Sequence, residues 1–66
     1  MVASNLLKAK ILEFNLSKSE IAKELGISDT SLNYKLNNKT EFKATEIVKL
    51  SNLLGISKEK DKYFFV

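Results

Sequence analysis

The segment from Leu16 to Lys39, LSKSEIAKELGISDTSLNYKLNNK, constrains the fold of this chain more than any other part. Ser17 and Glu20 stand three residues apart, which is the spacing of a capping box at the start of a helix. Apolar residues then recur at helical spacing, and Gly26 follows at the point where a helix commonly ends in a left-handed residue. Ser28 is suited to cap a second helix. The segment therefore predicts two short helices joined by a tight turn, at about Lys18–Leu25 and Asp29–Asn37.

The apolar residues around this turn have the spacing of a helix-turn-helix. Ala22 is small enough to let the two helices approach closely, and Ile27 can pack into the crevice between them. Leu32 and Leu36 lie one turn apart and define the core side of the second helix. A helix-turn-helix places its second helix in the major groove of DNA, so the pattern points to DNA binding.

The outward face of the second helix carries short, uncharged, hydrogen-bonding side chains. Because successive residues turn by about 100°, this face holds Thr30, Ser31, Tyr34 and Asn37, with Asn33 at its flank and Asp29 at the N-terminal tip. A solvated helix face more often alternates Glu and Lys. Reading base edges in a major groove requires donors and acceptors at close range, and this face provides them. We therefore predict base contacts from Asp29, Thr30, Asn33 and Tyr34.

Each of these residues also has a purely structural interpretation. Thr30 and Asn33 can simply be solvated. Asp29 can stabilise the helix dipole instead of accepting from a cytosine amino group. Tyr34 can pack its ring on the domain instead of contacting DNA or a thymine methyl group. Lys18 can be solvated, or it can hold a phosphate beside the amides of a helix N-terminus.

These motifs resemble the lambda-repressor-like helix-turn-helix family, which includes phage repressors, Cro proteins and many bacterial regulators. The family pattern has Gln at the first position of the first helix, then Leu-Ala, Gly-Val-Ser and, after the recognition helix, Asn-Gly-Lys. At these places the chain has Lys18, Ile21-Ala22, Gly26-Ile27-Ser28 and Asn37-Asn38-Lys39. With its ending Lys62-Tyr63-Phe64-Phe65, nearly the whole chain resembles small Cro-like proteins from phages and prophages of Gram-positive bacteria.

The resemblance implies a sequence-specific transcriptional repressor that acts by occupying promoter DNA. Asn38 stands at the family's glycine position, and asparagine tolerates the left-handed conformation better than other residues with a side chain. The resemblance implies that Asn37, Lys39, Thr40 and Lys43 face the DNA backbone. We also expect phosphate contacts from Lys18, at a helix N-terminus, and from Ser17 and Ser31.

The composition agrees with a polyanionic partner. The chain has eleven basic and eight acidic residues and a net charge of +3, and every basic residue is a lysine. The absence of arginine removes the bidentate contact of arginine with guanine and leaves Asn, Thr, Ser and Tyr as candidate base readers. Without cysteine or histidine, we expect no metal site, no cofactor and no enzymatic acid-base or nucleophile set.

The 66 residues predict one domain, 1–66, with an all-α fold of five helices. The first helix, about Ala3–Phe14, would turn Leu7, Ile11 and Phe14 inward. A loop over Asn38–Lys43 leads to a fourth helix, about Ala44–Leu54, with Ile47, Leu50 and Leu54 inward, and a short last helix starts at Ser57. Other lysines are interpreted as solvated surface: Lys8, Lys49, Lys58, Lys60 and Lys62. No apolar run approaches the length of a membrane span, so we expect a soluble cytoplasmic protein.

The C-terminal residues Tyr63, Phe64, Phe65 and Val66 allow two interpretations. Four large apolar residues cannot all enter so small a core, so an exposed patch here would mark an interface. They either cover the first and fourth helices within one monomer or form a self-complementary dimer contact. We expect a homodimer on DNA, since proteins of this size gain affinity by binding two half-sites. The alternative function is a protein-binding module, such as an antirepressor or antitoxin component, that grips another regulator with the same fold.

Overall fold

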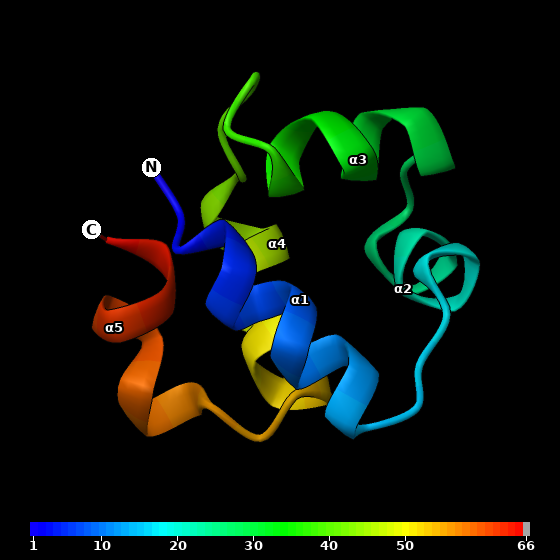
Figure 1. Ribbon diagram of the computed structural model, residues 1–66. Helices are drawn as coiled ribbons and strands as arrows, with labels where there is room; N and C mark the ends of the chain where they lie inside the picture. The colour runs from blue at the N-terminus through cyan, green and yellow to red at the C-terminus, as the bar shows by residue number, and fades with distance from the viewer. Residues whose placement is uncertain (66) are drawn as a thin grey trace.

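In the computed structural model, residues 1–65 are described, and they form five α-helices and one short 3-10 helix, with no strand (Figure 1). The elements are α1 (Ser4–Glu13), α2 (Lys18–Leu25), α3 (Asp29–Leu36), α4 (Ala44–Leu53), η1 (Ser57–Glu59) and α5 (Lys60–Phe64). The prediction of an all-α fold with five helices is confirmed. Within residues 1–65, no helix is both long and apolar enough to cross a lipid bilayer.

Several helix ends differ by one residue from the predicted boundaries. Phe14, Asn37 and Leu54 are the C-caps of α1, α3 and α4 and not residues inside these helices. A cap residue belongs only half to its helix, so hydrophobic periodicity alone does not locate it. The last helix begins at Ser57 as predicted, but its first turn is the 3-10 helix η1.

The start of α2 and the turn between α2 and α3 have the capping contacts that the sequence predicts. Ser17 Oγ accepts from the backbone N–H of Glu20 at 3.1 Å, and the Glu20 carboxylate accepts from the backbone N–H of Ser17 at 3.3 Å. Gly26 ends α2 with φ +72°, a left-handed conformation that glycine adopts without a steric penalty. Ser28 Oγ caps α3 by accepting from Ser31 N–H at 3.1 Å. These local signals therefore fix where α2 ends and α3 begins.

The hydrophobic core lies between the helices and contains most of the residues that the sequence predicts to be buried. Leu7, Ile21, Leu32, Leu36, Leu50, Leu54 and Ile56 are fully buried, whereas Ile27 and Ile47 pack against the core at its edge. The inward placement of Phe14 was wrong, because this residue is 45% exposed. Since α1 ends at Glu13, Phe14 leaves the buried helix face and its ring lies beside Gly55 instead.

The aromatic tail divides between core and surface. Tyr63 and Phe64 are buried, and the Phe64 ring meets Phe42 edge to face with centroids 5.7 Å apart. Tyr63 also accepts, through its carbonyl, a 2.7 Å hydrogen bond from Ala3 N–H. These two residues therefore belong to the monomer core and are not available to a dimer contact. Phe65 is 62% exposed, and Val66, the other residue predicted for that contact, lies outside the described residues.

The N-terminal segment is fastened to the end of α3 by contacts that the sequence did not indicate. Asn38 has φ +63°, the left-handed conformation that was predicted for it. Its side chain forms two bonds to the backbone of Val2, accepting from N–H at 2.7 Å and donating to the carbonyl at 3.0 Å. Ser4 Oγ donates to the Leu36 carbonyl. Consequently the start of α1 lies against the C-terminal end of α3 (Figure 1).

Candidate nucleic-acid interface

The exposed face of α3 and its C-cap together carry four polar side chains in one row, which we call the polar stripe: Thr30, Asn33, Tyr34 and Asn37. All four are exposed, although Leu32 and Leu36 on the same helix have no accessible surface. Their spacing of i, i+3, i+4 and i+7 places them along one side of the helix. In Figure 1, α3 runs along the upper edge of the molecule, so the helix predicted to read bases lies at the surface.

The residues at the start of α3 are engaged in contacts with their neighbours. Asp29 Oδ2 accepts a 2.7 Å hydrogen bond from Ser19 Oγ of α2. Ser31, which was predicted to face outward, is only half-exposed, and its Oγ accepts from Ser28 Oγ at 3.1 Å. Asp29 stands in the first turn, where a carboxylate interacts favourably with the helix dipole. These contacts match the structural interpretation of Asp29, and they engage Ser31 in the cap of α3.

Two exposed lysines approach the polar stripe from segments on either side of α3. Lys18, the first residue of α2, donates from Nζ to Asn33 Oδ1 at 3.2 Å. Lys39, in the loop after α3, places its Nζ 5.4 Å from the centre of the Tyr34 ring, a cation–π distance. Both ammonium groups remain at the surface, where an anion can reach them.

Lys8 joins this surface although its place in the sequence predicts a solvated exterior residue. It is half-buried, and its Nζ donates to Asn37 Oδ1 at 2.8 Å. Lys8 lies one turn after Ser4, the residue that bonds the end of α3. Nothing in the local sequence connects positions 8 and 37, because only the packing of α1 on α3 brings them together.

The remaining predicted phosphate contacts lie at the starts of helices and in the loop between α3 and α4. Ser17, Lys39, Thr40 and Lys43 are exposed. Ser17 and Lys43 are the N-caps of α2 and α4, where backbone amides without helical partners point outward. The Asn37 side chain, in contrast, is held by other side chains. Its position therefore suits the orientation of neighbouring groups better than a free phosphate contact.

A buried ion pair behind α3 supports this loop, and sequence reasoning missed it. Lys35 Nζ donates to Glu46 Oε1, and both side chains are almost completely buried. The same carboxylate oxygen accepts from the backbone N–H of Lys43 at 2.8 Å. Lys35 Nζ also lies 6.0 Å from the centre of the Phe42 ring. The pair thus joins α3 to the start of α4 and holds both ends of the loop that carries Lys39 and Thr40.

The Glu46 carboxyl gives the fold a predicted sensitivity to acid. Burial acts to raise its pKa, but the hydrogen bonds from Lys35 and Lys43 and the charges of these lysines outweigh burial and lower the pKa. A lowered folded pKa stabilises the protein above the ordinary carboxyl pKa of about 4.3, and this stabilisation is lost as pH falls through the folded value. The urea midpoint of unfolding should therefore decrease as the pH is lowered below about 4, and this decrease should be smaller in Glu46→Gln. Glu24→Gln, at an exposed position, is the control. An equal decrease of the urea midpoint at low pH in Glu46→Gln and Glu24→Gln would contradict this prediction.

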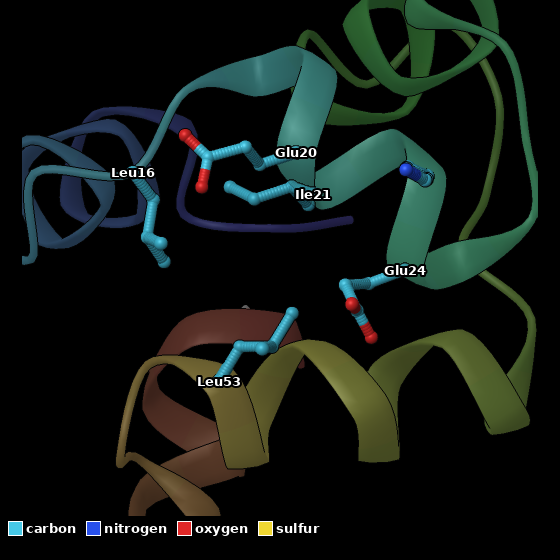
Figure 2. A pocket seen from close by; sticks show the side chains of 6 residues that line it. Leu16, Glu20, Ile21, Glu24 and Leu53 are labelled. Carbon is cyan, nitrogen blue, oxygen red and sulfur yellow. The ribbon is translucent and has the colours of Figure 1, made fainter.

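A groove of about 320 Å³ between α2 and α4 is separate from these residues. Figure 2 shows Leu53 of α4 reaching towards Ile21 of α2, with Leu16 near one end and the Glu24 carboxylate near the other. The Glu20 carboxylate also borders the groove, but it is engaged in the cap of α2. None of the predicted base or phosphate contacts lines this groove.

A sequence model of the DUF739 family, which is described as proteins of unknown function, matches residues 4–66. No curated protein matches the chain, and neither does any solved structure. The family match extends from the first residue of α1 to the end of the chain and includes every residue of the candidate interface. The protein therefore belongs to the DUF739 family.

Proposed function

We propose that the protein is a sequence-specific regulator that binds double-stranded DNA and reads the major groove with α3. The observation that carries this proposal is the polar stripe, which is exposed along α3 and approached by lysines from α1, α2 and the loop after α3. A major groove admits one α-helix and presents donors and acceptors to it. Hydroxyl, amide and phenol groups can pair with both kinds of base edge.

The roles divide between specificity and affinity. Thr30, Asn33 and Tyr34 face the base edges, whereas Asp29 mainly stabilises the start of α3. Ser17, Lys18, Lys39, Thr40 and Lys43 hold the sugar-phosphate backbone and set the register of α3 in the groove. The net charge of +3 favours association with DNA of any sequence. As with the lambda-repressor-like and Cro-like proteins that the sequence resembles, repression would follow from occupying a promoter in the bacterial cytoplasm.

The DNA-bound form is proposed to be a homodimer that contacts two half-sites. Support comes from an apolar surface on α4 and the tail, where Val48 is 49% exposed and Phe65 is also exposed. A hollow of about 380 Å³ adjoins these two residues and is lined as well by Phe42, Ala44, Ile47 and Lys60. Linking two DNA-binding helices raises affinity without any new base contact.

The proposal is tested by selecting sequences from a library of random DNA duplexes with the purified protein. Enrichment of one inverted-repeat sequence is the expected result, with half-sites about one helical turn apart. Asn33→Ala should then cost about 1–3 kcal/mol on the enriched duplex and little on random duplex. Recovery of no preferred sequence, with all duplexes bound equally, would contradict the proposal.

Lys39→Ala should weaken binding to specific and random duplexes alike, because Lys39 is assigned to phosphate and not to bases. The plot of log affinity against log salt concentration should flatten by about one unit, since the variant neutralises one phosphate fewer. Lys58→Ala is the matched control, since Lys58 is an exposed lysine in η1, at the opposite side of the molecule from α3 in Figure 1. Equal slopes for Lys39→Ala and wild type would remove Lys39 from the interface.

A protein-binding module remains the second candidate. The grooves at α2–α4 and at α4 and the tail favour it, because both are partly apolar and lie outside the polar stripe. This function predicts that substitutions at Thr30 and Asn33 leave binding to the other regulator unchanged and that substitution of Phe65 abolishes this binding. Duplex selection and regulator binding, measured on the same variants, separate the two candidates.

A further inference from the structure

Two asparagines of the polar stripe are connected to two lysines by a continuous set of hydrogen bonds. Lys8 Nζ donates to Asn37 Oδ1 at 2.8 Å. Asn37 Nδ2 donates to the Asn33 carbonyl at 2.8 Å and to Asn33 Oδ1 at 3.4 Å. Lys18 Nζ donates to the same Asn33 Oδ1 at 3.2 Å. The four side chains come from α1, α3 and α2, so three helices meet along one polar row.

The direction of these bonds fixes the orientation of both amides. An ammonium group has three donors and no acceptor, so each asparagine must turn its oxygen towards its lysine. Asn37 has its oxygen bonded to Lys8, and its NH₂ group therefore points to Asn33. The Asn33 oxygen then receives one donor from each side, which uses both of its lone pairs. Within residues 1–65, the Asn33 NH₂ group makes no hydrogen bond.

We propose that Lys8 and Lys18 orient the polar stripe so that Asn33 meets DNA as a donor only and selects a base edge that carries an acceptor. This inference rests on the proposed DNA-binding function and adds the class of base that Asn33 reads. In the major groove, guanine offers N7 and O6, adenine offers N7 and thymine offers O4, whereas cytosine offers only its amino donor. Asn33 accordingly rejects cytosine at the position it faces.

The same geometry excludes the bidentate contact that asparagine commonly makes with adenine. That contact needs the amide oxygen to accept from adenine N6 while the NH₂ group donates to N7. Here the oxygen is occupied, so Asn33 can donate to an acceptor of guanine, adenine or thymine but cannot single out adenine through its N6 group. Lys8 and Lys18 are positioning residues in this arrangement, because they determine base preference through Asn33. Lys18 combines this role with its phosphate contact.

The first arm of the test uses the protein without DNA. In nitrogen-15 spectra of Lys18→Met, the side-chain NH₂ signals of Asn33 should move, and in Lys8→Met those of Asn37 should move. Methionine keeps most of the length of lysine and removes the ammonium group, with its donors and its charge. Lys49→Met, at an exposed position of α4, is the control and should leave both pairs of signals unchanged. Asparagine signals in Lys8→Met and Lys18→Met that coincide with the wild-type signals would overturn the proposed orientation.

The second arm selects random DNA duplexes with wild type, Asn33→Asp and Lys18→Met. Wild type should deplete cytosine at one position about tenfold relative to guanine, adenine and thymine, as one hydrogen bond allows. Asn33→Asp keeps the shape and carries only acceptors, so cytosine should no longer be depleted at that position while the rest of the site is retained. In Lys18→Met one lone pair of the amide oxygen is released and can accept from adenine N6, so the preference should narrow to adenine.

The outcomes separate this inference from the proposed function. An unchanged profile in Asn33→Asp, or a strict requirement for adenine already in wild type, overturns the inference and leaves DNA binding intact. If wild type enriches no duplex sequence, the proposed function is overturned and the base-reading role of Asn33 is overturned with it. The amide spectra still report in that case whether the two lysines orient Asn33 and Asn37.

Discussion

Replacing Lys35 with methionine should destabilise the folded protein by about 3–5 kcal/mol, because the substitution leaves the Glu46 carboxylate buried without its partner. Within residues 1–65, the Lys43 N–H would remain as the one hydrogen-bond donor to that carboxylate. For a chain of this length the total stability is of the order of 3–10 kcal/mol, so this destabilisation brings the protein close to unfolding. Urea unfolding followed by helical circular dichroism measures it.

The double substitution Lys35→Met and Glu46→Leu decides whether the destabilisation comes from an unpaired charge. Two apolar side chains of similar volume should recover most of the stability, since removing both members of a buried pair is often neutral. Lys49→Met is the exposed control and should change the free energy of unfolding by no more than about 0.5 kcal/mol. A double variant as unstable as Lys35→Met would show that packing, and not the uncompensated charge, is responsible. This comparison remains informative even if Lys35→Met does not fold.

The elements that the sequence predicts well are those determined by neighbouring residues. Helix caps and left-handed residues depend on the backbone within a few positions, and each has the predicted form: the caps of Ser17 with Glu20 and of Ser28, and the left-handed Gly26 and Asn38. Periodicity likewise identifies the buried face of α3, because the side chains opposite the core must face solvent. The polar stripe follows from the same reasoning, and its exposure agrees with the prediction.

The features that the sequence does not predict depend on contacts between segments that are distant along the chain. Lys8 looks like an ordinary exposed lysine, and only the packing of α1 on α3 brings it to Asn37. Lys35 and Glu46 look like ordinary exposed charges until α3 and α4 enclose them. The Phe14 error has a different cause, since a helix that ends one residue earlier moves this side chain from the buried face to the surface. Packing and helix ends, more than propensity, therefore limit what sequence patterns predict here.

The tail should separate into a stabilising residue and an interface residue when Phe64 and Phe65 are substituted one at a time. Phe64→Ala should cost about 3–5 kcal/mol, because the ring is buried against Phe42 and its removal leaves a cavity. Phe65→Ala should change the free energy of unfolding by no more than about 0.5 kcal/mol, since most of its ring faces solvent. The two phenylalanines are adjacent, so each serves as the matched control for the other.

The binding measurements on Phe65→Ala then test the dimer part of the proposed function. If Phe65 contributes to a contact between two copies, affinity for an enriched duplex with two half-sites should fall by much more than affinity for one half-site. The reason is that the variant no longer links the binding of the second copy to the first, while the polar stripe of each monomer is unaffected. Equal affinities of Phe65→Ala and wild type for both duplexes would exclude Phe65 from the dimer contact. A large loss of stability in Phe65→Ala would instead place its ring in the core, against its observed exposure.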